Sequence, residues 1–130
     1  MDELIKKMKI IALNSNIICQ HSAALISNDK MFNIGYNKNI TYTNKTYSIH
    51  AEIDVLSSFY NKKKIKGMDL IVIRVKNKKL CMSKPCKHCL IKITKMGIRK
   101  VYYSTSNGVL ISEETVNMVS DHISSGNRFK

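Results

Sequence analysis

The sequence predicts an α/β fold from three observations. Apolar residues recur at helical spacing in residues 2–16, which indicates an amphipathic helix. Residues 70–75 form an apolar run rich in β-branched side chains, as is typical of a strand buried on both faces. Short apolar segments on either side of polar turn residues predict two β-hairpins. With 130 residues and 44% hydrophobic content, the chain can bury one core, so we expect a single domain over residues 1–130.

The amino-terminal part is expected to form a helix, a hairpin and a loop. The helix over residues 2–16 begins with acidic side chains, which suit a helix N-terminus, and should pack on a sheet. Strands at 22–26 and 31–36 flank the turn-forming tetrapeptide at 27–30. Residues 37–48 are polar and have no apolar period, so they predict a loop.

Two further helices are expected on either side of the buried strand. Residues 50–60 and 86–96 both carry apolar side chains in helical register. Pro85 stands before the second of these helices, where proline is tolerated, and Gly97 can end it. A turn at 76–79 follows the buried strand.

The carboxyl-terminal part predicts a hairpin and a closing helix. Strands at 100–104 and 109–111 are separated by a turn with an Asn-Gly pair at 107–108, a strong hairpin signal. Residues 112–123 begin with serine and two glutamates and continue with apolar side chains at helical spacing. The expected order is therefore α-β-β-α-β-α-β-β-α.

The basic excess of the chain lies in one segment. The formal net charge is +13, and residues 62–100 hold 14 basic side chains against the single acidic Asp69, while the rest of the chain holds eight of each sign. Such a segment either forms solvated lysine faces or creates a field that attracts phosphate. Nucleic acid is therefore one partner that the sequence allows.

The amino-terminal residues do not have the pattern of a signal peptide. Residues 1–8 mix charged and apolar side chains, and no later window has the length of a membrane span. We expect a soluble, cytoplasmic protein without a membrane partner. The C-x-x-C pair at 86–89 indicates metal or redox chemistry more often than a disulfide in such a chain.

Four residues in two short motifs predict a catalytic zinc site. Cys86 and Cys89 are three apart in a first helical turn, where the helix N-terminus favours the thiolate that binds metal. His50 supplies a third ligand from the start of the other helix, and three protein ligands leave the fourth tetrahedral position open. Glu52 follows the ligand by two residues, so it can move protons beside the metal rather than bind it.

Other residues of the same types are assigned structural roles. His88 lies inside the C-x-x-C motif and could compete as a ligand, but an exposed or substrate-facing side chain is expected. His21 has no partner pattern and is treated as structural. Cys19 and Cys81 are expected to be small buried side chains.

His-Ala-Glu at 50–52 and Pro-Cys-Lys-His-Cys at 85–89 together resemble the cytidine and deoxycytidylate deaminase superfamily of zinc-dependent enzymes. The resemblance runs from about residue 23 to residue 104. It implies a three-layer α-β-α fold with a five-stranded mixed sheet, helices on both faces and zinc between two helix N-termini. It also implies a hydrolase that converts cytosine to uracil in a nucleoside or nucleotide, and a homo-oligomer, as a dimer or tetramer.

The resemblance also proposes substrate contacts. Asn37 ends a segment that looks like the one with which this family places an asparagine against the sugar or base. Tyr36, Ala51 and Pro85, which stand beside the matched motif residues, complete the candidate contacts. Deaminases of free cytidine usually carry a glutamate two residues after this asparagine, and here the position is Asn39.

The signals for the branch of the family disagree. Residues 97–104 look like the strand after the zinc helix in deoxycytidylate deaminases. The Asn-Gly turn at 107–108 predicts an antiparallel last strand, as in cytidine and blasticidin deaminases. Three alternatives therefore stay open beside the nucleoside or nucleotide enzyme: a deaminase of cytosine or adenine in DNA or RNA, a blasticidin-S-type deaminase, and an inactive zinc-binding module.

Overall fold

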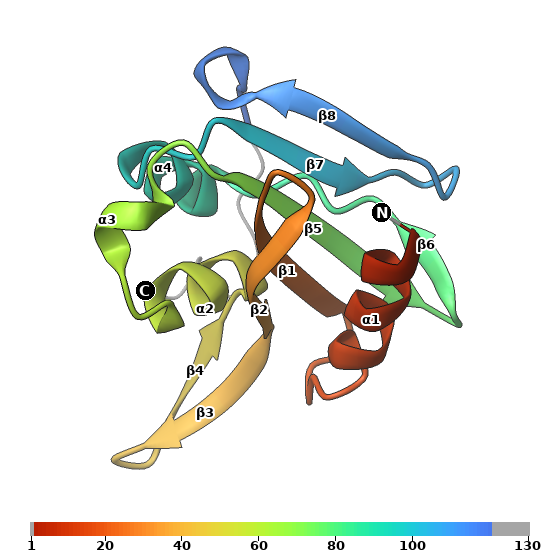
Figure 1. The fold of residues 1–130 in the computed structure, drawn as a ribbon. Coiled ribbons are helices and arrows are strands. Elements are labelled where there is room, and N and C mark those ends of the chain that lie inside the picture. The colour runs from red at the N-terminus through yellow and green to blue at the C-terminus, as the bar shows by residue number, and fades with distance from the viewer. Residues whose placement is uncertain (1, 121–130) are drawn as a thin grey trace.

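A mixed β-sheet is the central feature of residues 2–120, the part of the chain that the computed structural model describes (Figure 1). Its strands are β1 (Gln20–Ser27), β2 (Lys30–Tyr36), β5 (Asp69–Lys76), β6 (Lys79–Cys81), β7 (Lys100–Ser104) and β8 (Leu110–Glu114). Five of them pair in the order β2-β1-β5-β7-β8, and β6 is added beside β5. The pair β5 and β7 is parallel, and the other pairs are antiparallel.

Helices cover both faces of this sheet. They are α1 (Asp2–Ala12), α2 (Ala51–Ser58), the short α3 (Lys62–Ile65), α4 (Lys87–Lys95) and the 3₁₀ helix η1 (Thr115–Asn117). On one face α1 packs against β1, β2 and β5, and on the other α2 packs against β1 and β2 while contacting α4. The predicted mixed sheet with helices on both faces is thus confirmed, but β6 makes it six-stranded where five strands were predicted. Among the helices of residues 2–120, none is long and apolar enough to cross a bilayer.

Alternate residues of the central strands pack into two separate hydrophobic cores, one on each face of the sheet, because successive side chains of a strand point to opposite faces. On β1, Ala23 and Leu25 pack with α2 and α4, whereas Ala24 and Ile26 pack with α1. β5 alternates in the same way. The same alternation turns His21 of β1 and Arg74 of β5 toward the face that carries α2 and α4.

The turns of the predicted hairpins have the expected chemistry. Asn28 and Asp29 link β1 to β2 with φ values of 51° and 64°, which is the left-handed conformation that a tight two-residue hairpin turn needs. Asn77 and Lys78 adopt the same conformation after β5, and the chain then returns as β6, which the sequence did not predict.

The predicted loop at 37–48 is wrong, because this stretch forms a second, two-stranded sheet. β3 (Lys38–Tyr42) pairs antiparallel with β4 (Lys45–Ile49), and the hairpin extends away from the main sheet (Figure 1). Both of its faces are exposed along most of their length, including the aromatic Tyr42 and Tyr47. The strand signal was present but short: Ile40 and Tyr42 on β3, and Tyr47 and Ile49 on β4, alternate with polar residues around the turn at Thr43 and Asn44.

The predicted closing helix at 112–123 is also wrong over the described residues. Ser112, Glu113 and Glu114 instead extend β8, paired with β7, and only the single turn η1 follows. The Tyr103 hydroxyl donates to the Glu113 carboxylate at 2.7 Å, which ties these two strands together. Residues 121–123 of that predicted helix lie outside the described part of the chain.

Candidate active site

The starts of α2 and α4 bring the three predicted metal ligands together. His50 is the N-cap residue of α2, and Cys86 is the N-cap residue of α4, with Cys89 one helical turn later. These two helices pack side by side, so their N-termini meet over the sheet. All four cysteines of the chain are free thiols, which agrees with the expectation that they do not form disulfides.

The geometry of this cluster fits a zinc ion. One ligand atom each from His50, Cys86 and Cys89 lies within 4.8 Å of the others. The Nδ1 atom of His50 is 3.0 Å from the Cys89 sulfur and 3.7 Å from the Cys86 sulfur. Tetrahedral zinc with bonds of about 2.0–2.3 Å requires ligand separations of roughly 3.3–3.8 Å, so only small movements would complete the site. One imidazole and two thiolates form a donor set that zinc prefers.

One of the two thiols, Cys86, is already prepared to lose its proton. A hydrogen bond from Cys89 lowers the pKa of Cys86 to about 3, against the opposing effect of burial, and His50 contributes in the same direction. The same hydrogen bond, together with burial, raises the pKa of Cys89. The pair therefore shares one proton, and a divalent cation between the sulfurs would displace it.

Glu52 lies beside the metal cluster without belonging to it. Its side chain is 5% exposed, and burial raises the pKa of its carboxyl group, while the backbone N–H of Glu52 opposes this shift. A side-chain hydrogen bond connects it to Cys89. A buried carboxyl group with a raised pKa at the wall of a cavity is suited to accept and return a proton.

Gly35 fixes the position of the helix that carries His50 and Glu52. A Cβ atom at Gly35 would lie 2.6 Å from an Asp54 carboxylate oxygen and 2.9 Å from the Val55 nitrogen, so only glycine allows α2 to approach β2 this closely. The Asp54 carboxylate accepts a hydrogen bond from the Tyr36 backbone N–H at 3.2 Å, which joins the helix to the end of the strand.

A cavity of about 620 Å³ opens over the cluster, a size typical of small-molecule sites. Of the four candidate substrate contacts, Asn37 and Ala51 line this cavity, whereas Tyr36 and Pro85 are not among its lining residues. The described residues that line it are Ile17, Cys19, His21, Asn37, Ser48, His50, Ala51, Glu52, Arg74, Met82, Ser83, Lys84, Cys86 and Ser120.

The amide of Asn37 holds two segments of the cavity wall in place. Its oxygen accepts a hydrogen bond from the His21 backbone N–H at 2.8 Å, and its nitrogen donates to the Cys19 carbonyl at 2.6 Å. Asn37 therefore orders the start of β1 at the wall of the cavity. Cys19 is exposed at this edge, so the expectation that it is buried is wrong.

His21 and Arg74 are cavity residues that the sequence did not reveal. They are cross-strand partners at the ends of antiparallel β1 and β5. Burial lowers the pKa of His21 to about 4, and the charge of Arg74 adds to this effect, so the imidazole is neutral near pH 7. Its Nδ1–H donates to the Cys19 carbonyl at 3.0 Å, which leaves Nε2 as an acceptor.

The neutral state of His21 predicts a pH dependence of stability. The unfolded imidazole has a pKa of 6.5 and the folded one a pKa of about 4, so the unfolded state binds the proton first as pH falls. Stability should therefore decrease below about pH 6.5, with His21 accounting for about 1 kcal/mol of the loss between about pH 6 and pH 5. Urea unfolding of the parent and of His21→Gln at both pH values measures this contribution. An identical loss in both proteins would show that folding does not lower the pKa of His21.

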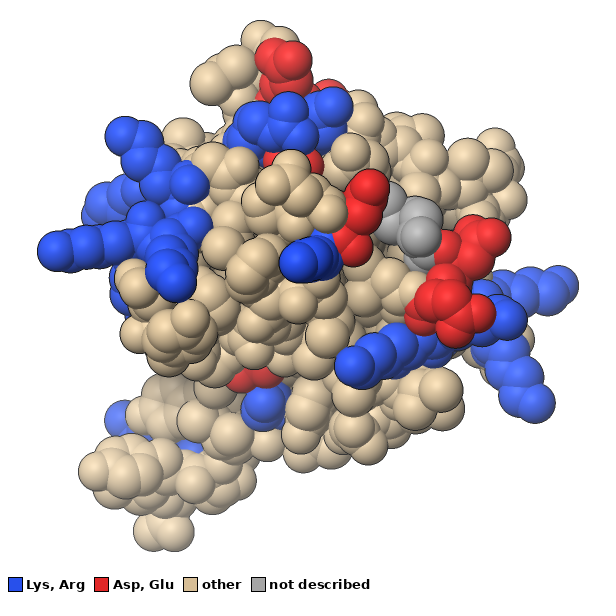
Figure 2. Space-filling model, in the orientation of Figure 1, with Lys and Arg blue, Asp and Glu red and all other residues tan. Residues whose placement is uncertain are grey.

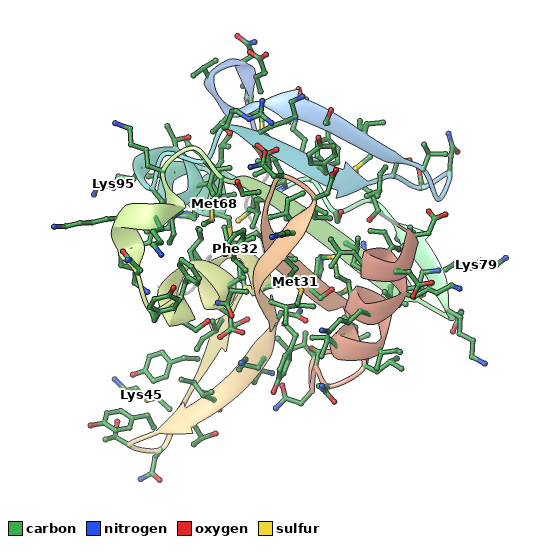
Figure 3. The ribbon with its side chains drawn as sticks, in the orientation of Figure 1. Met31, Phe32, Lys45, Met68, Lys79 and Lys95 are labelled. Carbon is green, nitrogen blue, oxygen red and sulfur yellow. The ribbon has the colours of Figure 1, made fainter. Side chains whose placement is uncertain are left out.

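The lysines of the basic segment do not converge on the cavity. None of Lys62, Lys63, Lys64, Lys78 and Lys79 lines it, and Lys84 and Arg74 are the basic residues of that segment that do. Basic side chains form separate groups at opposite edges of the molecule (Figure 2). Lys79 and Lys95 point outward on opposite sides (Figure 3). The segment therefore forms solvated faces, and the idea of one field near the metal ligands is not supported.

His88 lies outside the metal cluster. Its side chain is exposed, it does not line the cavity, and it is absent from the group of ligand atoms found among residues 2–120. The exposed side chain expected for His88 is thus confirmed. The C-x-x-C motif contributes its two sulfurs alone.

Comparison with solved structures finds the same fold in several deaminases. Cytidine deaminase from Burkholderia pseudomallei aligns with a TM-score of 0.66 over 94% of this chain and 98% of that protein, at 18% identity. The dCMP deaminase of cyanophage S-TIM5, in complex with dCMP and dUMP, aligns with a TM-score of 0.60 over 80% of this chain and 79% of that protein, also at 18% identity. Cytidine deaminase from Mycobacterium leprae gives 0.61 over 88% and 92%, again at 18% identity.

Sequence comparison assigns the family. The comparison with curated proteins found no match. A family model described as the cytidine and deoxycytidylate deaminase zinc-binding region matches residues 4–105, which include both motifs and the cavity wall between them. The chain therefore belongs to the cytidine and deoxycytidylate deaminase family.

Proposed function

We propose that this protein is a zinc-dependent hydrolase that converts cytosine to uracil in a free nucleoside or nucleotide. The observation that carries the proposal is the buried Glu52 beside the His50, Cys86 and Cys89 cluster, at the wall of a cavity large enough for one nucleotide. An inactive zinc-binding module would have no need of a buried carboxyl group at this point, because such a group costs free energy to bury.

The reaction follows from the roles of these side chains. His50 and the two cysteines would hold zinc, which supplies Lewis-acid activation of the attacking water when bound. Glu52 takes a proton from this water as its oxygen forms a bond to the carbon that carries the amino group. The same carboxyl group gives this proton to the neighbouring ring nitrogen, then takes the remaining proton of the former water from the new hydroxyl group and gives it to the amine. The carbon–nitrogen bond then breaks, and ammonia leaves.

The last strand of the sheet favours the branch that contains cytidine deaminases. β8 is antiparallel to β7, in agreement with the Asn-Gly turn and with the strand direction that the resemblance implies for cytidine and blasticidin deaminases. The alignment with the Burkholderia cytidine deaminase, which covers nearly all of both chains, supports the same choice. Deamination of DNA or RNA is less well supported, because the lysine-rich faces do not lead to the cavity.

Two further predictions accompany the function. A cytoplasmic location stays a prediction from the sequence. A homo-oligomer is proposed from the resemblance, and the exposed apolar side chains of the β3–β4 hairpin, Ile40, Tyr42 and Tyr47, are consistent with a contact between copies. Light scattering of the purified protein measures its mass in solution, and a monomer at all concentrations would contradict the homo-oligomer.

A substrate panel tests the proposed function. Zinc-loaded protein is incubated with cytidine, deoxycytidine, dCMP, blasticidin S, adenosine and a cytosine-containing oligonucleotide, and ammonia release is measured. We expect turnover of at least one free cytosine nucleoside or nucleotide and none of the oligonucleotide. Turnover of the oligonucleotide alone would assign the enzyme to nucleic acid, and no turnover of any compound would contradict the proposal.

A further inference from the structure

Arg74 is a charged residue of the cavity to which the proposed chemistry gives no role. Its Nη2 atom donates to the Cys19 sulfur at 3.2 Å, whereas its Nε atom is buried and has no hydrogen-bond partner within the described residues. The ion pairs found among residues 2–120 do not include Arg74. A buried N–H of a charged group without an acceptor costs free energy, unless a ligand supplies the acceptor.

The charges around the cavity leave Arg74 uncompensated. Glu52 is the single carboxylic side chain among the described lining residues, and its hydrogen bond goes to Cys89 of the metal cluster. Lys84, the other basic residue of the lining, already pairs with Glu113 at 3.4 Å. His21 faces Arg74 across the two strands and is neutral at pH 7, so it does not offset the charge. Arg74 therefore presents to the cavity a positive charge that forms no ion pair with a carboxylate of the described residues, and the Cys86 thiolate belongs to the metal cluster.

The position of Arg74 separates it from the reacting atoms. It projects from β5 beside His21, whereas the metal ligands project from the starts of α2 and α4. The His21 imidazole interacts electrostatically with Arg74 as well as with His50 and Cys86. A substrate whose amino group lies at the metal cluster would therefore extend past His21 toward Arg74 with its sugar end.

We propose that Arg74 determines substrate specificity by binding an anionic group on the sugar of the cytosine substrate, which rests on the function proposed above. The guanidinium group offers several N–H donors in one plane, a geometry that matches phosphate and carboxylate oxygens. Both the phosphate of dCMP and the carboxylate of blasticidin S have this chemistry. Phosphate carries the larger charge, so dCMP is expected to be a better substrate than deoxycytidine, although the antiparallel β8 is the strand direction implied for cytidine and blasticidin deaminases.

The experiment compares charged and neutral substrates in matched variants. For Arg74→Gln, kcat/KM should fall by about 10- to 100-fold with dCMP and by less than about 3-fold with deoxycytidine, because one charge-assisted interaction is lost. Arg74→Lys should recover part of the preference for dCMP. Lys79→Gln, an exposed lysine outside the cavity, should leave both values unchanged. Blasticidin S serves as the third substrate, and a larger loss with it than with dCMP would assign the site to a carboxylate.

A binding measurement separates this inference from the proposed function. Calorimetry should show that dUMP binds the parent about 10- to 100-fold more tightly than deoxyuridine, and that Arg74→Gln removes the difference. This preference without turnover of any cytosine compound would support the anion site and contradict the deaminase. If the parent deaminates a cytosine compound but binds dUMP no more tightly than deoxyuridine, the proposed function is supported and the role of Arg74 is overturned. Equal losses with dCMP and deoxycytidine in Arg74→Gln would likewise overturn it, since a contact to a neutral oxygen affects both.

Discussion

Replacement of Glu52 by glutamine is expected to lower kcat by about 10²- to 10⁴-fold while the protein keeps its fold and its zinc. The amide has nearly the same shape as the carboxyl group but cannot take a proton from water. Glu52 is not one of the three clustered ligand residues, so metal binding should not depend on it. Steady-state rates with the best substrate of the panel, together with zinc content and circular dichroism, measure the three properties.

Asp54→Asn is the matched control for Glu52→Gln. Asp54 lies on the same helix, and its carboxylate accepts from the Tyr36 backbone N–H and pairs with Lys38 at 3.1 Å. The asparagine oxygen can still accept the backbone hydrogen bond, and a partly exposed ion pair contributes little, so kcat should stay within about 3-fold of the parent. If Glu52→Gln were as active as this control, proton transfer would have to be assigned to another group.

The metal cluster could be predicted because the residues of each motif are separated by only two or three positions in the sequence. Cys86 and Cys89 lie within one helical turn, and Glu52 follows His50 by two residues, so each motif determines its own geometry once its helix begins. The predicted helices that carry the two motifs flank a predicted buried strand, so both helices were expected to pack on the same sheet. Only the approach of the two helix starts depends on the tertiary fold.

The anion-binding residue could not be found in this way, because His21 and Arg74 meet only through the register of β1 and β5. One signal was present: Arg74 is a charged residue inside an otherwise apolar internal strand, where a charge is costly without a purpose. His21 likewise stands just before the buried part of β1. The apolar pattern of the two strands makes His21 and Arg74 unusual, but it does not predict that these two residues lie opposite each other.

The wrong predictions at 37–48 and 112–123 both concern strands with mostly exposed side chains. The β3–β4 hairpin shows alternation only over short stretches of a polar segment, and the edge strand β8 shows none. At residues 112–114 the serine and two glutamates also match the start of a helix. Pairing with β7 outweighs that local preference, because it satisfies the backbone groups of both strands.

Cys86→Ser is expected to abolish zinc binding and activity together. The parent should hold about one zinc per chain, since one imidazole and two thiolates form a complete three-ligand site. Serine is a favoured N-cap residue, so it preserves the start of α4 while it removes a thiolate that zinc requires. Metal analysis after dialysis should give about one zinc per chain for the parent and close to none for the variant.

Thermal unfolding provides an independent readout of the same site. Zinc that binds only the folded chain raises its stability, so the parent should unfold at a higher temperature with zinc than with a chelator, whereas Cys86→Ser should show no difference. Cys81→Ser is the matched control: Cys81 is half-buried and does not belong to the ligand cluster, and it should keep both the zinc and the shift. Full zinc content in Cys86→Ser, or loss of zinc in Cys81→Ser, would require a different set of ligands.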